Sequence, residues 1–441
     1  MALKFWTPLV GNNIENQGLT STWTVRSGTV TSGSDAGVLG KAIRIGASPS
    51  DSAARLRYSS SVDFSDLLGL DQTFMAWVKL EGTTVNYNGT IVSSGNWNQG
   101  NNSWSFTIAA TGSHVFCGKA YSPTGIACTV PTGSWVHLAA TRDGTTGITK
   151  IYRNGEFVKS GSGYRTGSLT STEPKQLSIG IANYSNWCPF NGLIQDVRIY
   201  DEILSVRQIQ EISKGLIAHY QLSGTDVDVT NKKVYDCSGN GYHGEVVAAG
   251  NCPVFDTDSP RHLRCAKFDT TSKYLRITTL PALGDIWTIA WWGKWSTGTG
   301  GYMFWGYQNG NRYNMYRTAN KLYNNTGDGS NNPFYSSGTT VADAPFLGSW
   351  AHYAIVADGT NNKLYVNGEL YATAKTFKGI TGTALYMTGW DSSTSYKLAN
   401  TCLSDFRIYG TALKAEQVKE LYNNPISVTK NGNLMCMEVI E

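Results

Sequence analysis

The chain has 441 residues, which is too long for one ordinary hydrophobic core and predicts two or three domains. Only 15% of the residues are charged, and the formal net charge of +4 includes no run of Lys or Arg, which excludes nucleic acid and anionic membranes as partners. Gly, Ser, Thr, Asn and Tyr are abundant and favour strands joined by turns, so we expect an all-β protein with a neutral or polar partner.

We expect neither a signal peptide in the N-terminal segment nor membrane insertion of the chain. Residues 1–13 hold one Lys and a short apolar patch that Pro8 and Gly11 interrupt. No later stretch approaches the roughly 20 apolar residues of a membrane span. The eight Cys form no C-x-x-C pair, so we expect unpaired thiols and synthesis in a reducing cytoplasm.

Antiparallel strands dominate the first half of the chain. Apolar and polar residues alternate at the start of residues 135–143, which predicts a strand. Asn154–Gly155 then supplies the two positive φ angles of a tight hairpin turn. In the DVRIY segment at 196–200, Val197 and Ile199 face one way and the polar residues the other. This period of two predicts a strand with one buried face.

A short helix follows that strand. Apolar residues recur at every third position from Val206 to Ile212, and Ser205 and Gln208 form a capping box. In a second copy of this segment Lys414 replaces the capping serine, which predicts a weaker helix.

The second half of the chain repeats the first. Residues 72–80 are echoed by 287–295, and residues 133–158 by 348–371, at a distance of about 210 residues. We therefore expect two domains, residues 1–214 and 215–424, joined without a flexible linker. Residues 425–441 form a tail with a strand–turn–strand pattern, which is either a docking or assembly strand or a segment that folds back onto the second domain.

The repeated segments resemble a known family. SIGIANYSNWCPFNGLIQDVRIYDEILSVRQIQEI (178–212) is similar to the end of a laminin-G-like, concanavalin A-like jelly roll, and DCSGNGYHGEV (236–246) is similar to a stretch near its start. Residues 11–25 lack that S-G-N signature. The resemblance implies two tandem antiparallel β-sandwiches, each closed by a short C-terminal helix.

No catalytic constellation is found. Glycoside hydrolases of this fold need paired acids across the scissile bond, and no E-x-D-x-E spacing occurs. The G-x-S-x-G, P-loop and H-E-x-x-H motifs are also absent from the sequence. His137 and His352 recur at the same repeat position, where packed strand residues are expected rather than ligands. We expect a protein that is not an enzyme.

The resemblance also implies a calcium ion at the rim of the sandwich. Asp and Asn are equally ordinary turn residues, so we expect no cofactor and keep calcium as the alternative. The candidate ligands are Asp226, Asp228, Asp236, Asn240 and Asp328.

Aromatic residues within polar segments, expected to be loops, suggest glycan binding. Aromatic faces stack on sugar rings while amides bind hydroxyls, and neither requires charge. The alternative is that the tryptophans are core and the asparagines turns, as alternation indicates for Trp77, Trp135, Trp292 and Trp350. The candidates are Trp97, Asn98, Asn101, Trp104, Tyr184, Asn186, Trp187, Trp305, Tyr307, Asn309, Asn311, Tyr313, Trp390, Asp391 and Tyr396.

The sequence further resembles tandem laminin-G-like proteins of bacteriophage particles, including their short NGN-containing tail. This resemblance implies a non-enzymatic virion surface protein, made in the host cytoplasm, which serves as head decoration, head fibre or tail-associated adhesin. Its partners would be capsid or tail proteins and host or mucosal glycans, and homo-oligomerisation stays open. The alternatives are a bacterial carbohydrate-binding adhesin and a polysaccharide depolymerase.

Overall fold

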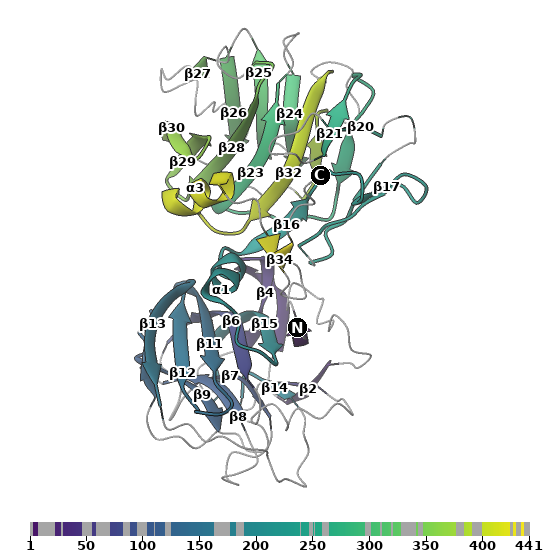
Figure 1. Ribbon diagram of the computed structural model, residues 1–441. Helices are drawn as coiled ribbons and strands as arrows, with labels where there is room; N and C mark the ends of the chain where they lie inside the picture. The colour runs from purple at the N-terminus through teal and green to yellow at the C-terminus, as the bar shows by residue number, and fades with distance from the viewer. Residues whose placement is uncertain are drawn as a thin grey trace. The chain divides into compact units, whose positions relative to one another are not determined.

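The computed structural model describes residues 3–7, 23–27, 30–45, 55–58, 71–82, 89–94, 104–109, 111–119, 125–162, 177–181, 189–238, 240–246, 250, 252–257, 264–295, 301–308, 311–318, 321–327, 341–342, 347–375, 383–389, 399–423, 427–428 and 434–435. The chain forms two compact units, Met1–Lys214 and Gly215–Glu441. Each unit contains two antiparallel sheets and one helix after its last long strand (Figure 1). We call the sheet that carries this closing helix the helix-side sheet, and the other one the far sheet.

In the first unit the helix-side sheet has eight strands and the far sheet seven. The helix-side order is β13 (Glu156–Gly161), β12 (Thr149–Arg153), β11 (Trp135–Arg142), β6 (Gln72–Leu80), β15 (Gly192–Tyr200), β4 (Gly40–Ile45) and β3 (Val30–Gly37), with β1 (Leu3–Thr7) also on β15. The far order is β10 (Ile126–Ala127), β9 (His114–Lys119), β8 (Trp104–Ile108), β7 (Gly89–Ser94), β14 (Leu177–Ile179), β5 (Arg55–Tyr58) and β2 (Trp23–Ser27). The closing helix is α1 (Val206–Ser213).

The second unit repeats this plan with eight and nine strands. The helix-side order is β20 (Val254–Asp256), β21 (Cys265–Phe268), β32 (Thr401–Tyr409), β23 (Ile286–Lys294), β28 (Trp350–Asp358), β29 (Asn361–Val366) and β30 (Glu369–Lys375), with β16 (Leu216–Tyr220) also on β32. The far order is β17 (Val227–Asp228), β18 (Lys233–Val234), β19 (Gly244–Glu245), β22 (Leu275–Ile277), β31 (Leu385–Met387), β24 (Gly301–Gln308), β25 (Asn311–Thr318), β26 (Lys321–Gly327) and β27 (Val341–Ala342). The closing helix is α3 (Ala415–Asn423).

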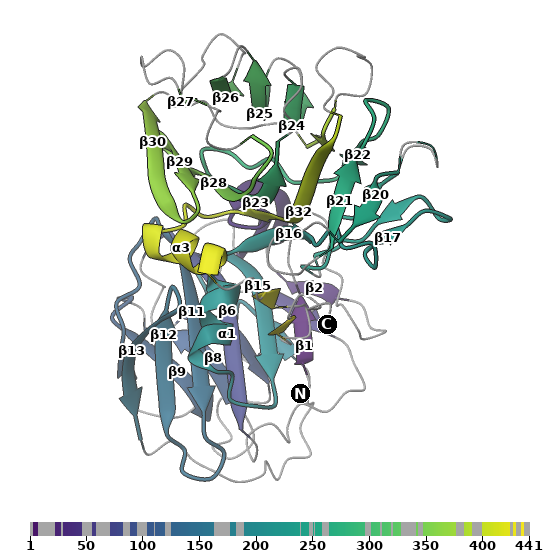
Figure 2. The same ribbon diagram turned by 45° about the horizontal axis from the view of Figure 1, so that its top comes forward.

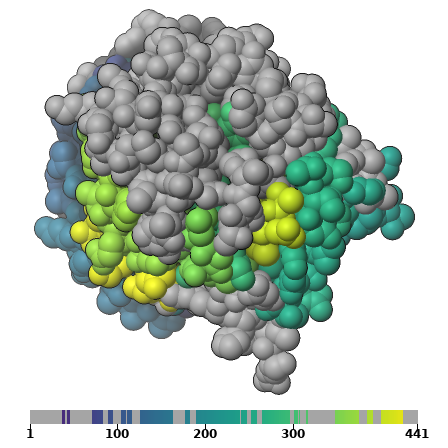
Figure 3. Space-filling view, turned by 90° about the horizontal axis from the view of Figure 1, so that it is seen from above, coloured from purple at the N-terminus to yellow at the C-terminus, as the bar shows by residue number. Residues whose placement is uncertain are grey.

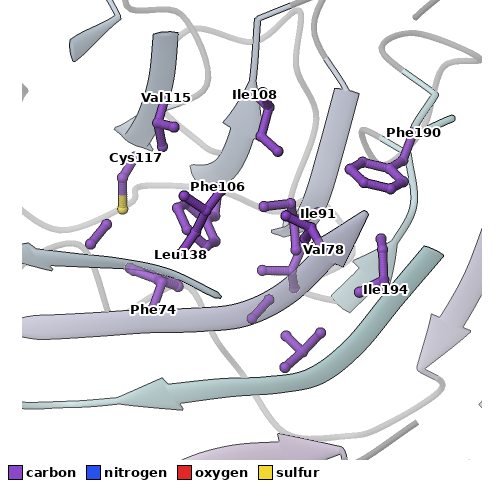
Figure 4. Packing of buried hydrophobic residues seen from close by; sticks show 14 of the residues in the cluster. Phe74, Val78, Ile91, Phe106, Ile108, Val115, Cys117, Leu138, Phe190 and Ile194 are labelled. Carbon is purple, nitrogen blue, oxygen red and sulfur yellow. The ribbon is translucent and has the colours of Figure 1, made fainter. Parts of the chain in front are cut away.

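The hydrophobic core of the first unit lies between its two sheets. Phe74 and Val78 of β6 and Leu138 of β11 gather with Phe106 and Ile108 of β8 (Figure 4). All five side chains are at most 1% exposed. Because successive strand residues point to opposite faces, every second residue of these strands enters the core.

Aromatic rings fill the corresponding core of the second unit. The Trp291 ring stacks on Tyr353, with centroids 5.4 Å apart. Phe304 of the far sheet meets Trp291 edge-on at 5.1 Å. These rings join the two sheets of the unit through contacts that aromatic pairs prefer.

Each closing helix lies on the outer side of its helix-side sheet. In the second unit Val418 and Leu421 of α3 share a buried cluster with Ala354 and Tyr365 of the sheet. Figure 2 shows α3 on the side of this sheet opposite to β24 and β25. All nine residues of β15 and of β32 are consequently buried. The predicted single buried face of residues 196–200 is wrong, because their polar side is also covered.

The predicted cap of α1 is present in the structure. Ser205 and Gln208 form the full capping box of α1, in which the Gln208 N–H donates to Ser205 Oγ (3.3 Å) and the Ser205 N–H to Gln208 Oε1 (2.9 Å). At α3 the Lys414 N–H donates to Gln417 Oε1 (2.9 Å), which is the backbone half of such a box. The lower stability of α3 stays a prediction.

The two Asn-Gly hairpin turns pack against the closing helices. Asn154 and Gly155 have φ angles of 52° and 82°, and Asn367 and Gly368 have 50° and 81°, which confirms the predicted tight turns. A Cβ on Gly155 would collide with Ser213 of α1. In the second unit the surface of the β29–β30 hairpin meets that of α3 (Figure 3). Glycine is therefore needed at Gly155 for the backbone angle and for the close approach.

The repeated D-x-R-I-Y segment builds a buried ion pair at a β-bulge. Asp196 and Asp405 both have φ of 54°, a left-handed conformation that Asp tolerates. Asp196 Oδ1 accepts from Arg198 Nε at 2.9 Å. Asp405 binds Arg407 through two bonds, Nε to Oδ1 (2.6 Å) and Nη2 to Oδ2 (2.9 Å). The motif is thus structural in both units.

The second unit adds a histidine to this pair. His219 of β16 lies 2.8 Å through Nε2 from Asp405 Oδ1, whereas Trp6 holds the same register position in the first unit. Burial raises the pKa of the Asp405 carboxyl, but the opposing Arg407 and His219 groups outweigh it and hold this pKa below its ordinary value.

His137 and His352 are packed strand residues, as the sequence predicts. They are 0% and 2% exposed, and their rings meet Trp77 and Trp292 edge-on at 5.2 and 5.4 Å. Both tryptophans are buried, as predicted, whereas Trp135 and Trp350 are only half-buried. Burial, and then the charge of Arg198, lower the pKa of His137 to about 3.

The first unit should lose stability as the pH falls below 6.5. The folded pKa of His137 lies below the ordinary value, so the unfolded chain takes up the proton first and stability is lost on acidification. Between pH 7 and pH 5 this residue should cost about 2 kcal/mol of unfolding free energy. Denaturant titrations at both pH values measure the loss, and His137→Phe should remove that share. If His137→Phe keeps the full pH dependence of the wild type, His137 is not the residue whose protonation lowers the stability.

The described tail and cysteines agree with their predictions. β33 (Ser427–Val428) and β34 (Leu434–Met435) pair as the expected antiparallel hairpin. No disulfide joins the described cysteines, which are Cys117, Cys128, Cys237, Cys252, Cys265 and Cys402.

Candidate functional site

A row of residues crosses the far sheet of the second unit. The pairing register places one residue from each of eight neighbouring strands directly opposite the next. In strand order this cross-strand row consists of Asp228, Lys233, Glu245, Arg276, Tyr386, Trp305, Asn314 and Asn325. Charged residues thus occupy one half of the row, and aromatic and amide residues the other.

The cross-strand row lies on the face turned away from the hydrophobic core. The positions beside it on β22, β31, β24 and β25 are all 0% exposed, and they are Leu275, Met387, Phe304 and Met315. Alternation places the row on the opposite face. The Arg276 and Glu245 side chains are 25% and 42% exposed, and Tyr386 is half-buried, whereas Asn314 is buried.

The charges of the row are balanced. Arg276 Nε and Nη2 each lie 2.8 Å from Glu245 Oε1. Asn231 donates to Asp228 through its backbone and its side chain, and these bonds hold the pKa of Asp228 below its ordinary value. Lys233 Nζ lies 4.9 Å from the centroid of the Tyr235 ring. The row therefore presents no net charge to a ligand.

The aromatic half of the row includes one predicted site residue, Trp305, and a second lies close to it. Trp305 and Tyr307 stand two apart on β24 and so share a face. Trp305 is flanked by Tyr386 of β31 and Asn314 of β25. The sheet therefore places aromatic and amide residues on adjacent strands, which is the combination that sugar binding requires.

The predicted loop around these residues is instead a pair of strands. Residues 304–314 span the end of β24 and the start of β25, so the loop prediction is wrong. An Asn-Gly between two alternating segments is a hairpin signal. Asn311 and Tyr313 occupy the opposite face from Trp305, since Tyr313 pairs with Gly306. The structure therefore does not place them in the row.

The prediction that Trp104 binds glycan is wrong. Its side chain is 0% exposed, and its ring lies 5.0 Å from that of Phe74 in the core of the first unit. Register pairs it with Ser94 and Lys119 on the core face of the far sheet. The preceding asparagines suggested a surface, but the strand begins at Trp104 itself.

The remaining glycan candidates lie outside the described residues. They are Trp97, Asn98, Asn101, Tyr184, Asn186, Trp187, Asn309, Trp390, Asp391 and Tyr396.

The described calcium candidates have hydrogen-bonded roles in turns. Asp236 Oδ1 accepts from the His219 N–H (2.9 Å), and Asp226 Oδ2 from the Leu222 N–H (2.8 Å). Asn240 donates through Nδ2 to the Leu216 carbonyl (2.8 Å). Asp228 is held by Asn231 as above, and Asp328 lies outside the described residues. The expectation of no cofactor, with calcium as the alternative, stays a prediction.

Neither a metal cluster nor a membrane-spanning helix was found in the described part of the chain. There, no three His, Cys, Asp or Glu side chains gather closely enough to hold a metal ion. None of the described helices is long and apolar enough to cross a membrane.

Sequence reasoning missed Arg276, Tyr386, Asn314 and Asn325. A local signal existed for two of them: Arg276 and Tyr386 are the central residues of apolar–polar–apolar triplets, which place the central side chain on the outer face of a strand. Their position beside Trp305 depends on strand pairing and has no local signal.

Comparisons with solved structures gave distant matches. The chain is similar to domain 4 of AbnA, a GH43 extracellular arabinanase from Geobacillus stearothermophilus, in complex with arabinotriose, at 21% identity over 48% of this chain and 100% of that one (TM-score 0.37). It is similar to domains LG4-5 of the mouse laminin alpha1 chain at 11% identity over 81% and 87% (TM-score 0.28). It matches the botulinum neurotoxin serotype D binding domain at 14% identity over 50% of this chain and only 55% of that one (TM-score 0.35).

Sequence comparison identifies the family. A search of curated protein sequences gave no significant match. The family model for the concanavalin A-like lectin/glucanases superfamily matches residues 56–210 and 269–419, once in each unit and over more than half of the chain. The expected laminin-G-like fold is thereby confirmed, and the chain belongs to the concanavalin A-like lectin/glucanases superfamily as a tandem of two such domains.

Proposed function

We propose that the chain is a non-enzymatic carbohydrate-binding protein that holds its ligand on the cross-strand row of the second unit. The observation that carries this proposal is the register of Trp305 between Tyr386 and Asn314 on the face away from the core. An aromatic ring covers the apolar face of a sugar, and neighbouring amides bind its hydroxyl groups.

Binding is favoured over hydrolysis by the residues present. The family contains both lectins and glucanases, so membership alone does not decide between them. Hydrolysis requires two carboxyl groups across one glycosidic bond. The sequence has no acid pair at the expected spacing, and in the row Glu245 is held by Arg276. Release of reducing ends from capsule or cell-wall polysaccharide would support a depolymerase instead.

Trp305→Ala should weaken glycan binding at least tenfold and leave the melting temperature of the second unit nearly unchanged. A nucleic-acid base stacked on an aromatic side chain contributes on the order of 1–3 kcal/mol, and we expect a sugar face on the Trp305 ring to contribute a comparable amount, which is lost with the ring. A glycan array identifies the strongest ligand, and titration calorimetry measures its affinity for both proteins.

Tyr371→Ala is the matched control for this substitution. Tyr371 lies on β30 of the helix-side sheet and is 44% exposed. The substitution therefore removes a surface ring from the same unit, but from the sheet that does not carry the row. Its loss should not change the affinity. Equal binding by wild-type protein and Trp305→Ala would exclude the row as the site.

Chelation of divalent cations should leave glycan binding unchanged. The Asp228 carboxylate accepts from the backbone and the side chain of Asn231, and Glu245 is paired with Arg276, so the acids of the row need no ion to order them. Affinity is compared in EDTA and in millimolar calcium. A loss of binding in EDTA that calcium restores would instead establish the calcium alternative.

We further propose that this binding serves a bacteriophage particle, as a head decoration, head fibre or tail-associated adhesin made in the host cytoplasm. The tandem domains and the hairpin of β33 and β34 support this, since they match the resemblance to phage proteins. Proteomics of purified particles tests it. Absence from the particles would favour the alternative, a bacterial adhesin.

A further inference from the structure

The far sheet of the first unit contains the counterpart of the cross-strand row. The strands β5, β14, β7, β8 and β9 follow one another in the same order as β22, β31, β24, β25 and β26. Their register defines a row that consists of Thr24, Arg57, Ser178, Ser93, Ser105 and Gly118. The two rows can thus be compared position by position.

Only the arginine is common to both rows. Arg57 and Arg276 occupy the same place on β5 and β22. From there the aromatic and amide residues of the second unit, Tyr386, Trp305, Asn314 and Asn325, are replaced in the first unit by Ser178, Ser93, Ser105 and Gly118. A serine has no ring face to stack on a sugar.

The serine row is also closed to solvent. Ser178, Ser93 and Ser105 are 0%, 3% and 3% exposed. Ser93 Oγ donates to the Ile181 carbonyl at 3.1 Å within the same unit. In the second unit Tyr386 at the place of Ser178 is half-buried, whereas Asn314 at the place of Ser105 is buried like its counterpart. The three described serines of the first row thus offer a ligand no exposed side chain, and Tyr386 offers a partly exposed ring.

We infer that, of the two described far-sheet rows, only the one in the second unit binds carbohydrate, and that it takes an extended neutral polysaccharide. This inference rests on the proposed function. Eight strands spaced about 4.8 Å apart give the row a length of roughly 34 Å, which suits a chain of sugars lying across the strands. The two cations of the row, Arg276 and Lys233, are matched by the carboxylates of Glu245 and Asp228, so the row carries no net charge to attract an acidic polymer.

Titration calorimetry of the full chain tests the inference. The probes are neutral β-linked gluco- and xylo-oligosaccharides of two to six units, with oligogalacturonates of the same lengths as the charged comparison. We expect an affinity for the six-unit ligand at least tenfold above that for two units, and weaker binding of the oligogalacturonates. Hydrogen exchange with ligand bound should protect β24, β25 and β31, and leave β7, β8 and β14 unchanged.

The outcomes separate this inference from the proposed function. Protection of β7, β8 and β14 in the first unit, or tighter binding of oligogalacturonates, would overturn the inference while carbohydrate binding stands. No binding of any probe, together with a negative glycan array, would overturn both.

Discussion

Trp104→Ala should lower the unfolding free energy of the first unit by about 3–5 kcal/mol and leave glycan binding unchanged. The side chain is fully buried, and its ring packs on Phe74 within the cluster that joins the two sheets. Truncation removes the buried apolar surface and leaves a cavity that the sheets cannot close. Differential scanning calorimetry measures the loss, and hydrogen exchange assigns it to the first unit.

The comparison with Trp305→Ala makes this prediction specific. Both residues are tryptophans on far-sheet strands, but Trp104 is on the core face and Trp305 on the opposite one. One substitution should therefore change stability and the other affinity. A stable Trp104→Ala protein that binds glycan poorly would show that Trp104 belongs to a ligand site after all.

Local chemistry explains which parts of the fold could be predicted. The turn at Asn154–Gly155 follows from two residues that accept positive φ, and the α1 cap follows from Ser205 and Gln208. The strong match between residues 133–158 and 348–371 predicts two domains without any knowledge of contacts. Each of these signals lies within a few residues of the feature that it predicts.

The candidate site could not be predicted in the same way. Whether a tryptophan beside polar residues enters the core depends on strand register, and a slip of one residue exchanges the two faces. Polar residues precede Trp104 and follow Trp305 closely, yet the register places the two positions on opposite faces of their sheets. The row itself joins residues from Asp228 to Tyr386, which only the pairing of eight strands brings side by side.

Covering of both sheet faces is a further non-local effect. Residues 196–200 alternate as a half-exposed strand does, but their polar positions are buried with Arg198 and Asp196 bonded to each other. The sequence pattern shows which residues share a face. It does not show that the outer side of the strand is also covered after the chain continues into the helix at Val206–Ser213.

Asp405→Asn should cost the second unit about 3–5 kcal/mol, because it leaves the buried Arg407 guanidinium without its opposing charge. Asn keeps the shape of Asp and also tolerates positive φ, so the loss reports the charge and not backbone strain. Asp196→Asn is the matched variant in the first unit. It should cost less, because Trp6 stands there at the register position of His219.

Acid should lower the unfolding free energy of the wild type more than that of the Asp405→Asn protein. The pKa of Asp405 is lower in the folded chain than its ordinary value near 4, so the ion pair contributes stability above that value and loses it as the pH falls below. Denaturant titrations at pH 5 and pH 3 should show a larger loss in the wild type than in Asp405→Asn. Equal losses in the two proteins would mean that the Asp405 charge adds nothing to stability, and Arg407 would then be held by its other bonds.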